Sequence, residues 1–173
     1  MEELILKAQK GDEDAFTSLV YEIRQDLYKI ARCRLSCEDD IEDAIQETMI
    51  VAFKDIKKLK KLEAYKKWLI KILVNKCNYI YKKNKNRNVS FDNINPESAC
   101  MENERYTELE EMDFYRVLSG LTYDERMAIT LFYLEEYSLK EISKLLKTNE
   151  NTVKTKLKRG RNKIKQRYIE GGF

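Results

Sequence analysis

The sequence predicts an all-α protein made of two small helical domains joined by a polar linker. Three observations lead to this prediction. Apolar residues recur at helical spacing along most of the chain, and no segment shows the sustained alternation that is typical of a strand. The 173 residues include one proline and five glycines, which favours helices over turn-rich β structure. Between residues 84 and 108 the helical pattern stops.

The first two predicted helices meet at Gly11 and Asp12. Gly11 is a candidate C-cap for a short helix with Leu4, Ile5 and Ala8 on its apolar face, and Asp12 is a candidate N-cap for the next helix. The apolar stripe of that second helix consists of Ala15, Phe16, Leu19, Ile23, Leu27, Ile30 and Ala31.

Two further helices are predicted before the linker. One begins near Asp40, and its stripe consists of Ile41, Ile45, Thr48, Met49, Ala52, Phe53 and Ile56. The other runs from about Ala64 to Lys83, and its candidate core residues are Trp68, Leu69, Ile72, Val74, Tyr79 and Ile80.

The predicted linker separates a domain at 1–84 from a domain at 109–173. Residues 85–108 hold the only proline and few aliphatic residues, a composition typical of a linker. After it, two capping boxes mark helix starts, Thr122 with Glu125 and Ser138 with Glu141.

Charge is segregated along the chain although the net charge is only +3. Residues 38–47 carry six acids and no base, whereas residues 57–71 carry seven lysines against one glutamate. Acids dominate from 92 to 113, and bases dominate from 140 onward. This segregation predicts separate surfaces for separate partners.

Cysteine usage and hydropathy indicate a soluble protein in the reducing environment of the cytoplasm. The four cysteines show no disulfide framework, no signal peptide precedes them, and no apolar run approaches the roughly 20 residues that span a bilayer. Membrane insertion is therefore not expected. Cys33 and Cys37, one helical turn apart, could form half of a metal site, but the chain has no histidine and its other cysteines are isolated. Ordinary thiols are the favoured interpretation, and we expect no metal and no cofactor.

Residues 138–165 predict a helix-turn-helix. A helix from Ser138 to Leu146 is followed by a short polar break, in which Asn149 can cap a last helix starting near Glu150. Packing through Ile142, Leu145, Val153 and Leu157 would leave a basic face outward. That face carries Lys154, Thr155, Lys158 and Arg159, and bases from Arg161 to Arg167 would add phosphate contacts. A solvated basic helix is the alternative, but the capped preceding helix, the short turn and the apolar docking face favour DNA binding.

At these motifs the chain resembles a bacterial RNA polymerase sigma factor of the sigma-70 family, extracytoplasmic-function (ECF) subfamily. The run "LTYDERMAITLFYLEEYSLKEISKLLKTNENTVKTKLKRGRNKIK" resembles sigma region 4. "LILKAQKGDEDAFTSLV" and "EDAIQETMIVAF" resemble the start of the family pattern and region 2.2, and "YKKWLIKILVNKCNYIYKK" resembles regions 2.3 and 2.4. The chain departs from the pattern at Lys147 and Asn151, where many members have glycine, and at Thr122 and Tyr79.

The resemblance implies a function and a set of partners. Such a factor binds core RNA polymerase and brings it to promoter DNA, and it catalyses nothing itself. Its region 2 recognises and opens the −10 element, its region 4 binds the −35 element as duplex, and an anti-sigma factor commonly regulates it. Residues 57–64 resemble the loop that helps hold a flipped −10 base.

The resemblance also assigns residues to these partners. The polymerase-binding candidates share a polar helix face, with a merely solvated face as the alternative, and are Asp43, Gln46 and Glu47. The −10 candidates combine cations and aromatic rings, which suits single-stranded DNA, and are Lys67, Trp68, Lys71, Asn75, Tyr79 and Lys82. Core packing is an equal alternative for Trp68. The −35 candidates are Asn151, Thr152, Lys154, Thr155, Lys158, Arg159 and Arg161.

Two other classes of protein are alternatives to this hypothesis. A polymerase-independent DNA-binding regulator would explain the helix-turn-helix equally well, but not the acidic face beside a helix of lysines and aromatic residues. An enzyme is disfavoured because the sequence shows no histidine, no glycine-rich phosphate loop and no clustered acid and base.

Overall fold

The computed structural model describes residues 1–87, 117–118 and 120–169, and for residues 85–87 it describes the backbone alone. Every regular element among these residues is helical, as the sequence predicts. The chain divides into two compact units, Met1–Pro96 and Glu97–Phe173. The predicted linker lies almost wholly outside the described residues, so its conformation and the predicted domain limits stay predictions.

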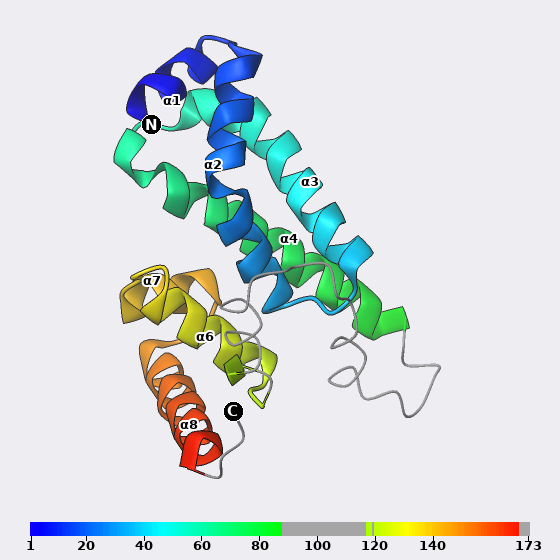
Figure 1. Ribbon diagram of the computed structural model, residues 1–173, viewed down its shortest axis with the longest axis vertical. Coiled ribbons are helices and arrows are strands. Elements are labelled where there is room, and N and C mark those ends of the chain that lie inside the picture. The colour runs from blue at the N-terminus through cyan, green and yellow to red at the C-terminus, as the bar shows by residue number, and fades with distance from the viewer. Residues whose placement is uncertain (88–116, 119, 170–173) are drawn as a thin grey trace. The chain divides into compact units, whose positions relative to one another are not determined.

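The first unit is a bundle in which α2, α3 and α4 pack against one another and α1 covers one end of α2 (Figure 1). Two single turns of 3-10 helix connect α3 to α4. The elements are α1 (Glu2–Gln9), α2 (Glu13–Arg32), α3 (Glu38–Asp55), η1 (Ile56–Lys58), η2 (Leu62–Ala64) and α4 (Tyr65–Arg87). The structure extends α4 four residues beyond the predicted end at Lys83.

The turn between α1 and α2 has the predicted chemistry. Gly11 adopts φ +100°, a left-handed conformation that costs a residue without a Cβ atom little. The Asp12 side chain then accepts a hydrogen bond of 2.9 Å from the Ala15 amide and caps α2.

The core of the first unit contains most of the predicted stripes. Side chains that are less than 2% exposed come from every long element and include Ile5, Leu19, Leu27, Ile30, Ile41, Ile56, Tyr65, Leu69, Ile70 and Leu73. For two residues the prediction of a core position is wrong. Tyr79 is 63% exposed, and Phe53 is 40% exposed although its ring packs edge-on against Phe16 at 5.1 Å. On α3 and α4 the buried face is therefore narrower than periodicity alone suggests, whereas the predicted stripe of α2 is buried throughout.

The second unit is built on α6 (Tyr123–Tyr133), α7 (Leu139–Leu145) and α8 (Glu150–Ile169), which all contact one another. Both predicted capping boxes are present, since Thr122 and Ser138 accept from the amides of Glu125 and Glu141 and each glutamate bonds back to the cap amide. The core between these helices includes Met127, Leu131, Ile142, Val153 and Leu157.

Gly160 explains how closely α6 and α8 approach. The glycine is buried, and a Cβ atom added there would lie 3.1 Å from Cγ1 of Ile129. The missing side chain therefore lets α8 lie directly on α6. None of the helices in the described part of the chain is both long enough and apolar enough to cross a membrane.

Candidate nucleic-acid and partner surfaces

The helix-turn-helix is formed by α7 and α8. Ile142 and Leu145 of α7 and Val153 and Leu157 of α8 are all buried, as predicted from their spacing. In the turn, Asn149 Oδ1 accepts a hydrogen bond of 2.7 Å from the Thr152 amide and caps α8. Lys147 adopts φ +52°, the left-handed conformation that favours glycine. The tight turn therefore forms with a lysine at the position where the resemblance predicts a glycine.

The structure places most of the predicted −35 residues on the exposed side of α8. The exposed members are Asn151, Lys154, Thr155, Lys158, Arg159 and Arg161. Thr152 is only half-buried beside the turn. The Thr155 hydroxyl donates to the Asn151 carbonyl at 2.9 Å, so its oxygen remains able to accept from an outside donor. The only acid of α8 is the exposed Glu150 at its start, and from Asn151 onward this face offers cations and polar groups.

The opposite side of α8 is also basic, but its lysines hold α8 to α6. Lys156 Nζ lies 2.7 Å from Asp124, and Lys163 Nζ lies 2.8 Å from Glu125. The sequence pattern predicts phosphate contacts for the bases near 163. It does not reveal these ion pairs, because the acids stand 32 and 38 residues earlier in the chain.

Glu125 is the most constrained charge in the second unit. Its side chain is 7% exposed, and its carboxylate accepts from both the Thr122 amide at 2.9 Å and Lys163. Burial alone would raise the pKa of Glu125, but the hydrogen bonds from Lys163 and Thr122 together lower that pKa below its ordinary value. The charged form is therefore part of the folded structure.

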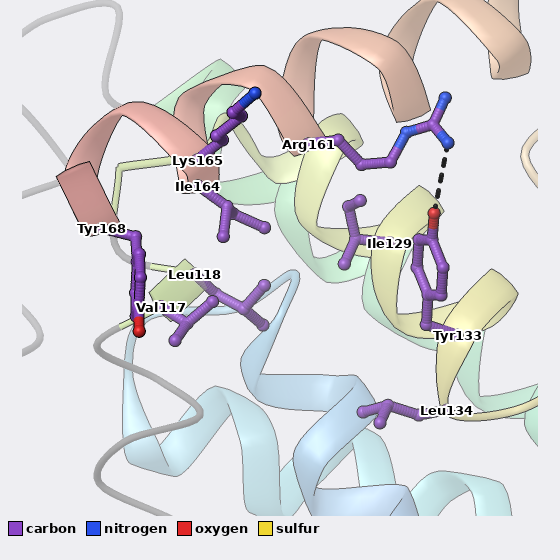
Figure 2. Close-up of a pocket in the computed structure, with 9 residues that line it drawn as sticks. All are labelled: Val117, Leu118, Ile129, Tyr133, Leu134, Arg161, Ile164, Lys165 and Tyr168. Carbon is purple, nitrogen blue, oxygen red and sulfur yellow. Dashed lines mark hydrogen bonds between the residues drawn. The ribbon is translucent and has the colours of Figure 1, made fainter.

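An apolar groove of about 520 Å³ lies on the second unit beside the end of α8 (Figure 2). Arg161 stands at its rim, where Nη1 bonds the Tyr133 hydroxyl at 3.5 Å. Lys165 also lines it, and the remaining lining side chains are apolar or aromatic: Val117, Leu118, Ile129, Tyr133, Leu134, Ile164 and Tyr168. The sequence predicts a DNA contact for Arg161 and gives no sign of this groove.

The predicted polymerase-binding residues share one exposed face of α3. Asp43, Gln46 and Glu47 all point to solvent, while Ala44 and Thr48 on the other side are buried. Ile50 continues the same face one turn later and is 54% exposed. Ile50 lies outside the apolar stripe that the sequence predicts for this helix, and no role is predicted for it.

Five of the six predicted −10 residues form one exposed stripe on α4, namely Lys67, Lys71, Asn75, Tyr79 and Lys82. Trp68 is half-buried, and its ring lies 6.1 Å from that of the buried Tyr65. Tyr79 thus belongs to the cationic face and not to the core. Cations at one-turn intervals around an exposed ring can follow a phosphate backbone and stack on a base.

An ion pair joins the α3 and α4 faces. Lys76 Nζ of α4 lies 2.7 Å from the Glu47 carboxylate of α3. Both side chains are part-exposed, at 30% and 48%, so the pair contributes little to stability. The pair therefore matters for position, because it holds the Glu47 side chain toward α4.

The described cysteines are ordinary thiols. Cys33 and Cys77 are buried and Cys37 is exposed, and Cys100 lies outside the described residues. Burial raises the pKa of Cys77 to about 12, which makes its thiol unreactive. Within the described ranges, no group of three or more cysteine and acidic side chains could hold a metal ion.

Fold and surfaces together define a two-unit helical protein with a helix-turn-helix in its second unit. The family model for sigma-70 region 2 matches residues 19–87, and the model for sigma-70 region 4 matches residues 111–164. The chain belongs to the sigma-70 family of RNA polymerase sigma factors, in its ECF group. As such it is a transcription initiation factor that directs polymerase to promoters, and not an enzyme.

Characterised relatives resemble the chain along nearly its whole length. It is 27% identical to the RNA polymerase sigma factor SigV of Bacillus subtilis over 154 residues, which cover 89% of this chain and 91% of SigV. It is also 27% identical to the ECF sigma-E factor of Escherichia coli K12 over 173 residues, with 93% and 90% of the two chains covered.

Solved structures share the fold at lower identity. The sigma factor RpoE from Bartonella quintana, solved with the anti-sigma factor NepR, has a TM-score of 0.69 at 24% identity, covering 87% of this chain and 94% of RpoE. CnrH, solved with the cytosolic domain of CnrY, has a TM-score of 0.63 at 20% identity, covering 98% and 97% of the two chains.

Proposed function

We propose that this sigma factor divides promoter recognition between its two units. The α3 face at Asp43, Gln46 and Glu47 binds core polymerase. The exposed stripe of α4 binds the opened −10 element as a single strand. The outward side of α8, centred on Lys154, Lys158 and Arg159, binds the −35 element in the major groove. The protein acts in the cytoplasm, where polymerase and promoters are.

One observation carries this proposal. An acidic exposed face on α3 and a cationic, aromatic-bearing face on α4 belong to neighbouring helices of one unit, while α8 supplies a separate basic face in the other. A regulator that works without polymerase needs the third surface alone. Opposite charges on α3 and α4 suit two partners of opposite charge, a basic protein surface and a nucleic-acid strand.

Adding positive charge to this face of α3 tests the polymerase contact. Asp43→Arg with Gln46→Arg changes two exposed positions and leaves the Glu47–Lys76 pair in place. We expect the helical content and the melting temperature to stay near the wild-type values, because substitutions at exposed positions usually cost within about 0.5 kcal/mol. Core-polymerase binding should fall steeply, since like charges brought together at an interface cost several kcal/mol.

The matched control is Glu22→Arg, a reversal at an exposed position of α2. Binding is measured by fluorescence anisotropy of labelled chain with purified core polymerase, and function by promoter-directed transcription in vitro. If the folded double variant still supports transcription, this α3 face does not hold the polymerase. If the wild-type chain starts no transcription with core enzyme, the polymerase-independent regulator is the better description.

We also propose an anti-sigma protein as a further partner. The structural relative RpoE was solved with the anti-sigma factor NepR, and CnrH was solved with the cytosolic domain of CnrY. The groove on the second unit supports a protein partner, because its floor is apolar and Arg161 and Lys165 supply a basic rim. An apolar helix with acidic flanks would suit both features.

A further inference from the structure

The last residue of α1 reaches the connection between α3 and α4. Gln9 Nε2 donates two hydrogen bonds, one of 2.9 Å to the Ile56 carbonyl and one of 2.8 Å to the Leu59 carbonyl. These acceptors lie 47 and 50 residues further along the chain. The Leu59 amide donates to the same Ile56 carbonyl at 3.0 Å. One side-chain amide therefore fixes both ends of the η1 turn.

The connection held in this way presents a concentrated positive charge. Lys57, Lys58, Lys60 and Lys61 are all exposed, while Ile56 is buried and Leu59 is half-buried. Lys58 pairs with Asp55 at 2.6 Å at the start of this segment. The inward side of the turn is thus anchored by apolar packing and by Gln9, and its outward side consists of lysines.

This segment leads directly into the exposed stripe of α4. The turn η2 (Leu62–Ala64) ends where α4 begins, and Lys67 is the first residue of the stripe. The four lysines thus come just before this stripe along the chain, separated from it by η2. Where these lysines stand depends on the backbone of residues 56–61, which belongs to no long helix.

We propose that Gln9 is a positioning residue for −10 recognition. By bonding both carbonyls before DNA arrives, it keeps the lysine-bearing connection in one conformation, so that binding does not have to order it. This inference rests on the proposed role of α4 in −10 binding. Gln9 itself contacts no DNA and acts through the backbone of Ile56 and Leu59.

A substitution of similar length tests the proposal. Gln9→Met keeps the unbranched side chain but removes both donors. The control, Gln25→Met, makes the same chemical change at an exposed position of α2. Holoenzyme assembled from wild-type chain and core polymerase first selects promoter DNA from a random pool. Single-stranded oligonucleotides of the selected −10 sequence, with each base substituted in turn, then serve as probes.

We expect Gln9→Met holoenzyme to bind the selected −10 strand about tenfold more weakly, because binding must then order the connection; tenfold corresponds to about 1.4 kcal/mol. Its preference among the substituted bases should flatten. Binding of the free chain to −35 duplex and to core polymerase should not change, and Gln25→Met should behave as wild type.

The outcomes separate this inference from the function on which it rests. If wild-type holoenzyme retains no −10 strand, the proposed function fails whatever Gln9 does. If wild type binds and Gln9→Met keeps the same affinity and base preference, the positioning role is wrong. An equal loss of −10, −35 and polymerase binding would assign Gln9 to stability alone.

Gln9→Lys guards against a variant that does not fold. The lysine side chain is long enough to reach both backbone carbonyls, and its ammonium group can donate a hydrogen bond to each. The added charge raises affinity for any strand, so base preference is the deciding measurement. The proposal requires Gln9→Lys to keep the wild-type base preference, and a flattened preference in this folded variant would overturn it.

Discussion

At the scale of single residues, Lys147 is a strained position that the sequence alone only suggested. The lysine occupies a left-handed conformation at φ +52° between α7 and α8. Such a conformation costs a residue with a Cβ atom about 1–3 kcal/mol, whereas glycine adopts it freely. The strain is small enough for the surrounding packing of Leu145 and Val153 to offset it.

Lys147→Gly should therefore stabilise the second unit. Part of this gain is lost, because glycine makes the unfolded chain more flexible and so stabilises the unfolded state by about 0.4–1 kcal/mol. The expected net effect is an increase of about 1 kcal/mol in the free energy of unfolding, measured by urea denaturation. Lys144→Gly, inside α7, is the control and should destabilise by about 1 kcal/mol. A loss of stability at both positions would contradict the strain.

Glu125 makes the stability of the second unit depend on pH. Since its pKa in the folded state lies below the ordinary value of 4.5, its contribution is fully present above pH 4.5 and is lost as the pH falls through the lower folded value. Glu125→Gln should therefore lose less stability than wild type on acidification. Unfolding by urea from pH 7 to pH 3 measures this, with Glu136→Gln at an exposed position as the control. Parallel curves for Glu125→Gln and wild type would refute it.

At the scale of elements, α8 divides its bases between two tasks. Lys154, Lys158 and Arg159 face outward, while Lys156 and Lys163 pair with acids of α6. The helix can therefore dock on its own unit and on DNA at once, because the two sets lie on different sides. The charge run in the sequence does not distinguish them.

Substitutions on the two sides of α8 should have different effects. Arg159→Ala and Lys154→Ala should change −35 sequence preference, since a good contact to a base edge contributes about 1–3 kcal/mol of discrimination. Lys165→Ala, at an exposed position, should weaken binding to all sequences. It should also reduce the slope of the logarithm of the binding constant against the logarithm of salt concentration by about one unit. Lys163→Ala should instead lower thermal stability. Competition binding to a set of −35 duplexes at several salt concentrations gives the first two results. An unchanged preference in both Arg159→Ala and Lys154→Ala would exclude them from base recognition.

The contact of α6 with α8 should not tolerate a larger residue at Gly160. A Cβ atom there already meets Ile129 at 3.1 Å, and the further methyl groups of valine would overpack the contact. Gly160→Val should lower the free energy of unfolding by about 1–3 kcal/mol in a urea titration. Asn162→Val, exposed on the same helix, controls for the change in helix propensity and should cost much less.

At the scale of the whole molecule, each unit has its own buried core. Leu19, Leu27 and Leu69 belong to the first core, and Met127 and Ile142 belong to the second. A unit with its own core can fold alone. Residues 1–96 and 97–173, expressed separately, should each give a helical circular dichroism spectrum and a cooperative melt. A separate unit that is unfolded, while the full chain is folded, would show that its stability depends on the other.

Patterns within a few residues determined much of this protein from sequence. The caps at Asp12, Thr122, Ser138 and Asn149 follow from local chemistry, because a side-chain oxygen and an amide two or three residues away are neighbours in any helix start. The exposed sets on α3, α4 and α8 follow from helical periodicity. The resemblance to the family follows from three stretches of sequence that occur in the family's order along the chain.

Tertiary structure decided what depends on residues distant in sequence. The pairing of Lys163 with Glu125, of Lys76 with Glu47 and of Gln9 with two backbone carbonyls joins positions 29 to 50 residues apart. The exposure of Tyr79 and Ile50 also depends on how far each neighbouring helix extends across α3 and α4. Periodicity gives the direction of a side chain around its own helix, but only packing decides whether another element covers it.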